Sequence, residues 1–565
     1  MIWLTAVIAY LLVVYFGPIA WLLRYALEGG GGSLLQVLGS SVTRSILVNT
    51  LTFAAAITIL TLLFSYPIAY FAATSHGRTR NALLLVSTIP LWTSLLVRSV
   101  AWLIVLARHG PVNEILLALG LISEPLNMTH NTVGFYVSSL YILVPTMVLA
   151  LFASMRGIDP AHVKSARTLG AHPLQAFLNV YVPLSIPAVV SGCLLVFIIA
   201  LGFFVTPSLL GGPSDRQFSM LIQQTVDRFA DFTRGAALSL VLLICSLACL
   251  ALFGWVAGFN QFMGGRYRGK SLGSLQRVSL KLRYLDVPLR PLAPVLESRR
   301  LWLIVVTITL VFMFVPYIVI IPLSFSDAEY LEFPPSTWSL RWYEEIAGSS
   351  RWLTAGITSV VVGGIAAAIA VSLSFVGSLG MRDAPGRVSR VALPLIIAPM
   401  LIPSIIYSVG AFMTASTIGL SDTVLGIALA HAALALPVCF ILIATAVDGV
   451  DPAIERAARS LGASTLTSTR RIMLPLVRPV LYVAALLAFQ TSFDEIVVAL
   501  FMSGVQTRTI PRLMWEGARL EVNPAISAVA VLVLGAILIL AVVTGIVQQA
   551  SLWRRQRVRV EESSQ

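Results

Sequence analysis

Long apolar runs separated by short polar segments dominate the pattern of this chain. A helix needs about 20 mainly apolar residues to cross a bilayer, and twelve runs reach that length. The first is not followed by a small-residue cleavage site, so we expect a retained helix rather than a removed signal peptide. The pattern predicts an all-α integral membrane protein with about 12 transmembrane helices, near 3–23, 46–73, 82–107, 132–154, 181–205, 235–258, 301–323, 353–379, 388–416, 423–446, 473–501 and 525–548.

Two stretches of the chain repeat each other at one constant offset. GIDPAHVKSARTLGAHPLQAFLNVYVPLSIP begins at Gly157, and GVDPAIERAARSLGASTLTSTRRIMLPLVRP begins at Gly449, 292 positions later. The same offset relates Gly212 to Gly504. We therefore expect two parallel six-helix repeats, with a first half at 1–258, a basic cytoplasmic linker at 259–300 and a second half at 301–565.

The register also reveals an insertion in the first half. Pro90 and Pro145 are 55 positions apart, whereas their counterparts Pro399 and Pro437 are 38 apart. This difference predicts a longer outer loop in the first half, around Arg108–Asn131.

Each copy of the repeated stretch has the sequence of a short, well-capped helix. Asp159 and Asp451 are favourable N-caps, and each is followed by proline at the first helical position. About ten residues later, Gly170 and Gly462 can end the helix in a left-handed turn. A corner between two spans would explain one such copy. Two matched copies favour docking to a partner.

This motif resembles the EAA loop of ABC importer permeases, whose short helix sits in a cleft of a separate ATPase subunit. The resemblance implies a type I importer permease with both transmembrane subunits fused. It implies two copies of a cytoplasmic ABC ATPase subunit that bind ATP and Mg, and no cofactor in this chain. Lys164 and Arg456 replace the family's glutamate, which indicates an unusually acidic ATPase surface. The implied ATPase-coupling residues are Gly157, Asp159, Pro160, Ala166, Leu169, Gly170, Ala171, Gly449, Asp451, Pro452, Ala457, Ala458, Leu461, Gly462 and Ala463.

Other stretches resemble the spermidine/putrescine-type permease family. They are FPPSTWSLRWY from Phe333, SFDEIVVALF from Ser492 and TIPRLMWEG from Thr509, with PLWTSLLVR from Pro90 and PSLLGG from Pro207 resembling the partner subunit. The resemblance implies binding-protein-dependent import of polyamine-like or other small cationic amines. Ferric iron, thiamine, phosphonate and amino-acid-like solutes remain alternatives. We expect an extracytoplasmic solute-binding protein to dock on the outer loops at 206–234 and 324–350.

The repeat register also points to a pathway. At the 292 offset, Gly202 and Phe203 correspond to Asp494 and Glu495. Ionisable groups at membrane depth usually line a cavity or pair with another group. A cationic amine would be a suitable partner for these carboxylates, with Phe203 and Trp92 available for cation–π contacts.

The same carboxylates have a structural alternative, in which one pairs with a base such as Arg98 or Arg512, or caps a helix at the outer interface. Arg98 would equally suit an anionic solute, which keeps phosphonates and carboxylates open. The candidate pathway residues are Asp494, Glu495, Phe203, Trp92, Arg98, Trp515 and Glu516.

Composition and charge support a membrane protein. Apolar residues make up 58% of the chain and charged residues 11%, against about a quarter charged in soluble domains. The net charge of +13 comes from bases gathered in the predicted inner loops, which places both termini in the cytoplasm of a bacterial inner-membrane protein. We therefore expect lipid, and no nucleic acid, as the surrounding partner. The four cysteines lie in apolar runs without metal-ligand spacing, so we expect no metal site.

GGRYRGKS, from Gly264, fits the phosphate-loop pattern, but it follows a membrane helix with no room for a sheet, and a basic linker that attracts anionic lipid explains it better. We expect no catalytic residues, hence no enzyme, with ATP hydrolysis on partner subunits. A secondary transporter of the major facilitator type also has twelve helices in two parallel repeats, but it needs no matched capped helices. The run GGGGS at 29–33 is typical of a flexible outer loop and also of an engineered linker.

Overall fold

The computed structural model describes residues 2–27, 32–257, 298–330, 333–520, 524–536, 538, 539 and 542. Within these ranges the regular structure is helical, apart from an isolated bridge between Ser326 and Trp338. The predicted basic linker at 259–300 lies almost entirely outside the described residues. So do the string at 264–271 and most of the glycine run at 29–33.

The first half is built around two long helices, α4 and α8, which pack against each other and against α11. Its helices are α1 (Ile2–Leu11), α2 (Gly17–Leu27), α3 (Gly32–Gly39), α4 (Ser41–Thr74), α5 (Gly77–Thr88), α6 (Leu95–Val105), α7 (Pro111–Ala118), α8 (Thr132–Met155), α9 (Pro160–Thr168), α10 (Pro173–Ala176), α11 (Val182–Leu201), α12 (Val205–Leu210), α13 (Phe218–Asp227) and α14 (Phe232–Ala257).

The second half repeats this plan around α21, α24 and α27, which pack against one another. Its helices are α19 (Arg299–Leu323), α20 (Arg341–Gly348), α21 (Ser350–Arg382), α22 (Gly386–Leu401), α23 (Ser404–Thr417), α24 (Val424–Asp448), α25 (Pro452–Ser460), α26 (Thr465–Ser468), α27 (Leu474–Asp494), α28 (Val497–Met502) and α29 (Ile510–Leu520).

The all-α membrane fold with two repeats is confirmed, with differences in the spans. Among the described residues, nine helices are long and apolar enough to cross a membrane, and up to 11 if each of two bent pairs is one span. The predicted runs at 181–205 and 473–501 are too long, because those helices end at Leu201 and Asp494 before the separate helices α12 and α28. The last predicted run is described as helix chiefly over Ala525–Ala536, so the number twelve stays a prediction.

Two predicted spans, 82–107 and 388–416, are broken rather than straight. Helices α5 and α6 meet at 95°, and α22 and α23 meet at 97°. In the second half the break falls at Ile402, whose backbone is extended with φ −112° and ψ 127°. Ile402 precedes Pro403, and the residue before a proline is driven out of the helical region by the proline ring.

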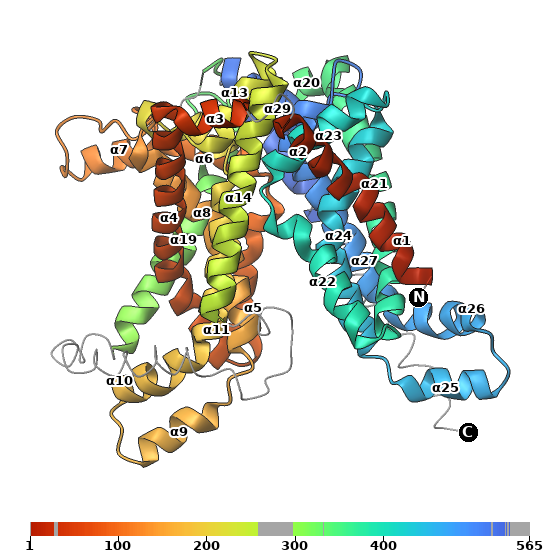
Figure 1. Ribbon diagram of the computed structural model, residues 1–565. Helices are drawn as coiled ribbons and strands as arrows, with labels where there is room; N and C mark the ends of the chain where they lie inside the picture. Colours follow the sequence, from red (N-terminus) through yellow and green to blue (C-terminus); the bar gives the residue numbers. More distant parts are fainter. Residues whose placement is uncertain are drawn as a thin grey trace.

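The first helix of each half packs against the other half. Tyr10 of α1 donates a hydrogen bond to the Leu429 carbonyl of α24 at 2.6 Å, and the Tyr15 ring stacks on Tyr407 at 4.6 Å. In return, Phe312 of α19 packs against Trp102 of α6 at 4.8 Å. Figure 1 shows the halves side by side, close together near α23 and α29 and apart at the end that carries α9 and α25. The exchanged helices tie the halves into one body.

Local backbone geometry repeats at the predicted offset. His130 and Asp422, 292 positions apart, both have positive φ, of 54° and 55°. A side-chain oxygen of the next residue then caps the following helix: Asn131 accepts from Gly134 N–H at 3.1 Å, and Thr423 from Gly426 N–H at 3.1 Å. The two halves therefore share their turns and caps as well as their spans.

Candidate functional site

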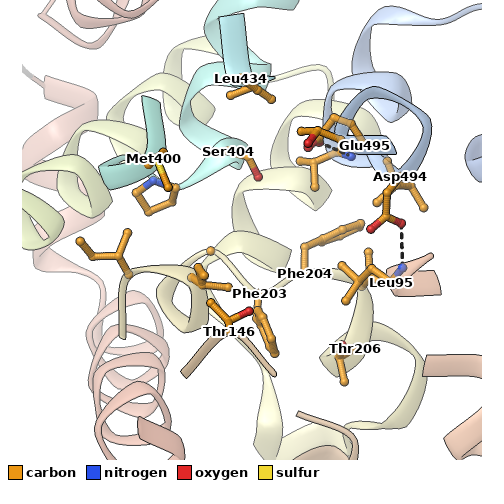
Figure 2. Close-up of a pocket in the computed structure, with 18 of the residues that line it drawn as sticks. Leu95, Thr146, Phe203, Phe204, Thr206, Met400, Ser404, Leu434, Asp494 and Glu495 are labelled. Atoms are coloured by element: carbon orange, nitrogen blue, oxygen red, sulfur yellow. Dashed lines mark hydrogen bonds between the residues drawn. The ribbon is translucent and has the colours of Figure 1, made fainter. Parts of the chain in front are cut away.

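A cavity of about 480 Å³ lies between the two halves. Its walls come from α6, α8, α11 and α12 of the first half and from α22, α23, α24, α27 and α28 of the second. Both broken spans contribute residues close to their bends. Its volume is within the range of small-molecule sites. Figure 2 shows Asp494 and Glu495 on the second half, with Phe203 and Phe204 on the first.

The structure brings four of the seven candidate pathway residues to this cavity. The other three, Trp92, Trp515 and Glu516, are not among its lining residues. Trp515 is buried behind the wall, with its ring 5.0 Å from that of Phe204. Glu516 lies outside the cavity and forms an ion pair with Arg351 at 2.8 Å. The cavity-lining candidates are Arg98, Phe203, Asp494 and Glu495.

Asp494 is engaged by the opposite half through both carboxylate oxygens. Oδ1 accepts a hydrogen bond from Leu95 N–H at 2.7 Å, at the first residue of α6. Oδ2 lies 3.8 Å from Nη2 of Arg98, whose side chain is buried. A carboxylate at a helix N-terminus satisfies a free N–H and opposes the positive end of the helix dipole. Asp494 thus has the paired and capping arrangement, which was the structural alternative in the sequence.

Glu495 differs from its neighbour because one of its oxygens is free. Oε1 accepts from Val497 N–H at 3.0 Å and from Val498 N–H at 3.2 Å, at the start of α28. Within the described part of the chain, Oε2 has no hydrogen-bond or ion-pair partner. Since Arg98 lies opposite Asp494, Glu495 is the carboxyl group of this cavity that has no cationic partner within the described residues.

A second polar contact between the halves lies one turn before Asp494. Nε2 of Gln490 donates to the Leu91 carbonyl at 2.7 Å, at the bend of the first half's broken span. The equivalent contact on the other side is apolar, because Gly202 has no side chain and a Cβ there would lie 3.2 Å from Cβ of Pro403. We call the contacts of Gln490 and Asp494 with the first half the latch.

The sequence reasoning missed Gln490 and Phe204. The signal for Gln490 was present, since the 292 offset aligns it with Ile198, an apolar residue, just as it aligns Asp494 with Gly202. For Phe204 there was no such signal, because an aromatic residue in an apolar run is usual.

The short helices α9 and α25 lie at the ends of the two halves that are far apart (Figure 1). Their predicted caps are confirmed: Asp159 accepts from Ala161 N–H and Asp451 from Ala453 N–H, both at 2.8 Å. Gly170 has φ +89°. The final residues before the terminal glycines, Leu169 and Leu461, are 88% and 89% exposed. Each helix thus presents an exposed leucine beside a glycine turn.

The two short helices are anchored differently. Glu455 of α25 lies 2.8 Å from Arg459 and 3.8 Å from Arg382, the last residue of α21. Arg382 also donates to the Val450 carbonyl at 3.2 Å. At the 292 offset Glu455 corresponds to Val163, which cannot form an ion pair. Among the described residues, this ion pair between the short helix and the long helix is therefore found in the second half and not in the first.

On the opposite end of the molecule, Asp422 closes the turn before α24. Its carboxylate accepts hydrogen bonds from Gly504 N–H at 2.7 Å and from the Thr507 hydroxyl at 2.6 Å. Partial burial alone would raise its pKa, but the hydrogen bonds from Thr507, Gly504 and Gln506 outweigh that effect and lower the pKa of Asp422 below its ordinary value of 3.8.

Asp422→Asn should destabilise this turn by about 1 kcal/mol, since hydrogen bonds to a charged acceptor are stronger than those to a neutral one. Because the folded pKa lies below the unfolded one, the carboxylate's contribution is fully present above pH 3.8 and is lost as the pH falls through the folded pKa. Melting temperatures in detergent should therefore differ at neutral pH and converge in acid. A difference that did not change with pH would contradict this role.

The comparisons with known proteins agree with the repeat. A family described as "Binding-protein-dependent transport system inner membrane component" matches residues 65–263 and again 374–557. The spermidine/putrescine transport system permease protein PotB of Escherichia coli (strain K12) is 34% identical over 199 residues, which cover 35% of this chain and 72% of that protein.

A longer relative spans both halves. The probable ABC transporter permease protein y4fN of Sinorhizobium fredii (strain NBRC 101917 / NGR234) is 25% identical over 425 residues, covering 73% of this chain and 71% of that protein. Among solved structures, a chain of a bacterial alginate ABC transporter, in complex with alginate pentasaccharide-bound periplasmic protein, matches at 20% identity. That match has a TM-score of 0.39 and covers 46% of this chain and 93% of the other.

Proposed function

The chain belongs to the family of binding-protein-dependent transport system inner membrane components, and from that membership we propose that it carries small amine cations through the cavity between its halves. It is the permease of an ABC importer, a transport component rather than an enzyme. A secondary transporter of the major facilitator type, the rival suggested by twelve predicted spans, is therefore wrong. With the family present twice, the chain corresponds to two permease subunits in one polypeptide.

The observation that carries the proposed solute is the free Oε2 of Glu495. A charge inside a membrane protein is costly unless something pairs with it, and Arg98 is already opposite Asp494. A solute ammonium group would supply the missing partner. The relative PotB is named for spermidine and putrescine, which are amines of this kind.

The rest of the cavity suits a short amine with an apolar middle. Oε1 of Gln490 is buried and lacks a partner within the described residues, so it can accept from a second ammonium group. Phe203 and Phe204 give the first half's side of the cavity an apolar surface for methylene groups. Ferric iron, thiamine, phosphonate and amino-acid-like solutes are the alternatives that the transport assay below would reveal.

For energy, we propose two ABC ATPase subunits that bind ATP and Mg and dock on α9 and α25. The exposed Leu169 and Leu461 and the rigid glycine turns support this docking. Lys164 and Arg456 on the same helices favour an acidic cleft in the ATPase. We propose that α9 and α25 lie on the cytoplasmic side of the inner membrane, as do both termini of the chain. The solute-binding protein would then dock on the loops at 206–234 and 324–350.

Glu495→Gln tests the solute proposal. Glutamine keeps an oxygen for the α28 cap but removes the charge, and a hydrogen bond to a charged group contributes about 1.5–3 kcal/mol. Uptake of putrescine or spermidine into proteoliposomes, with the ATPase subunits and the binding protein present, should fall by about ten- to a hundredfold.

Thr491→Val is the matched control, because Thr491 lines the same cavity without a charge. It should change uptake little. Unchanged polyamine uptake by Glu495→Gln would refute the role of this carboxylate. Uptake by the wild type of an anion, thiamine or ferric iron in place of amines would refute the solute class.

A further inference from the structure

The insertion in the first half forms an ordered hairpin, residues 108–131, which we call the outer hairpin. Helix α7 (Pro111–Ala118) forms its first arm, and the chain returns to α8 through residues 119–131. The second half connects the equivalent spans in 17 fewer residues, the difference between 55 and 38 in the spacing of matched prolines. The proposed transport function gives this segment no role.

The outer hairpin is held in shape by one buried side chain. Asn113, which is fully buried, donates from Nδ2 to the Ala107 carbonyl at 3.1 Å and to the Leu126 carbonyl at 2.9 Å. Its Oδ1 accepts from Leu126 N–H at 2.8 Å. Helix α7 ends at Ala118, and Gly120, two residues later, has φ +66°, with Leu121 N–H bonded back to the Leu116 carbonyl at 3.0 Å. The tip therefore has a fixed shape before it meets any partner.

The tip of this rigid hairpin is apolar and uncovered. Five apolar residues and Gly120, over Leu117–Ile122, form it. Ile115 is 58% exposed, and Leu119 and Leu121 are each 67% exposed. Apolar surface left in water costs roughly 25 cal/mol per Å², and consecutive exposed apolar residues in an ordered segment mark an interaction site.

The position of the hairpin indicates what covers it. In Figure 1, α7 projects sideways from the first half, away from the second half, at about the height of α3. Two leucines of α3, Leu35 and Leu38, are also exposed, as is Val133 at the start of α8. The apolar tip therefore lies at about the height of α3, which also carries exposed apolar side chains. A solute-binding protein placed over the cavity between the halves would lie away from the hairpin tip, because the tip projects away from the second half.

We propose that the tip of the outer hairpin inserts into the outer leaflet of the membrane, with the lipid surface as its partner. Leu119 and Leu121 would lie at the boundary between head groups and acyl chains, where amphipathic segments bind. Arg108 and Glu124, both exposed, would remain among the head groups. Because Asn113 has already ordered the hairpin, insertion requires little further loss of conformational entropy. This proposal is independent of the solute that the cavity carries.

Spin labels at the tip test it. Leu121→Cys and, as a matched control on the same hairpin, Glu124→Cys would be labelled in the full chain reconstituted in liposomes. The unsubstituted chain, labelled in parallel, corrects for its four native cysteines. The label at 121 should be relaxed several-fold more by oxygen, which concentrates in lipid, than by a water-soluble nickel chelate, and the label at 124 should show the reverse.

Two outcomes would contradict insertion of the tip into lipid. Equal or greater relaxation by the nickel chelate at both positions would overturn lipid insertion. Protection of position 121 that appeared only when the solute-binding protein was added would assign the tip to that protein instead. Leu119→Cys gives an independent reading if the label at 121 disturbs the turn at Gly120.

Discussion

Replacing Asp494 by alanine should loosen the contact between the two halves and abolish solute uptake. Alanine removes the acceptor for Leu95 N–H and leaves Arg98, which is only 6% exposed, without its counter-charge. Breaking a buried ion pair by removing one partner costs about 3–5 kcal/mol. Since Asp494 is 25% exposed and its contact with Arg98 is 3.8 Å long, we expect the free energy of unfolding to fall by about 3 kcal/mol, the lower end of that range. The measurement is the unfolding transition of the purified chain, together with uptake in proteoliposomes.

Two further variants separate the latch from the solute site. Asp494→Asn keeps an oxygen for Leu95 N–H but not the charge, so it should lose part of the stability lost by Asp494→Ala. Glu495→Gln should lose uptake with a smaller loss of stability than Asp494→Ala, because glutamine keeps an oxygen for the α28 cap and no cation of the described chain pairs with Glu495. If Asp494→Ala unfolded like the wild type and lost only uptake, Asp494 would be a solute ligand and not part of the latch.

The latch makes the inter-half contact unequal on its two sides. The second half contributes Gln490 and Asp494, whose polar atoms contact the bend of the first half at Leu91 and Leu95. The opposite contact joins Gly202 to the bend at Pro403 without side-chain hydrogen bonds. When the halves move to pass a solute, the polar side must exchange hydrogen bonds, while the apolar side can slide. We therefore expect Asp494 and Gln490, and not Gly202, to govern opening of this contact.

Much of the fold could be predicted from the sequence because membrane spans are set by the length of apolar runs. The breaks at 95° and 97° could not, since a hydropathy pattern is the same for a straight span and a bent one. The presence of a proline does not distinguish a bent span from a straight one either. Pro145 and Pro437 lie inside the continuous helices α8 and α24, whereas Pro403 follows a sharp break.

The exchange of first helices was also invisible in the sequence. Nothing in the apolar face of α1 indicates that its neighbour is α21 of the second half, because lipid-exposed and protein-exposed positions are equally apolar. For the same reason, the boundaries 1–258 and 301–565 describe the halves along the chain but not in space.

Sequence reasoning was most successful where the interactions are local. The caps of α9 and α25 join residues two positions apart, so the motif determines them. It failed for contacts that join distant segments. The register singled out Asp494 and Glu495 equally, and only the position of α6 shows that one is paired and the other is free.

Gly170→Pro and Gly462→Pro should uncouple ATP hydrolysis from transport. Both glycines have φ near +89° and +86°, which proline cannot adopt because its ring fixes φ near −65°. Proline also removes the N–H that Gly170 donates to the Arg167 carbonyl and that Gly462 donates to Arg459. A penalty of about 3 kcal/mol would leave well under a tenth of the molecules with the short helix correctly ended. Uptake per ATP hydrolysed, measured in proteoliposomes with the ATPase subunits, should fall more than about tenfold.

Gly120→Pro supplies the control, since Gly120 also has positive φ and donates its N–H to the Leu117 carbonyl, but it ends the outer α7. It should leave the coupling ratio unchanged.

Gly170→Pro should be the more severe of the two coupling variants. In the second half, the ion pair of Glu455 with Arg382 still joins α25 to α21 after the glycine turn is lost, and α9 has no such ion pair within the described residues. Normal coupling in both variants would exclude α9 and α25 as the ATPase contacts. Equal coupling defects in the two variants would mean that the ion pair between Glu455 and Arg382 does not contribute to coupling.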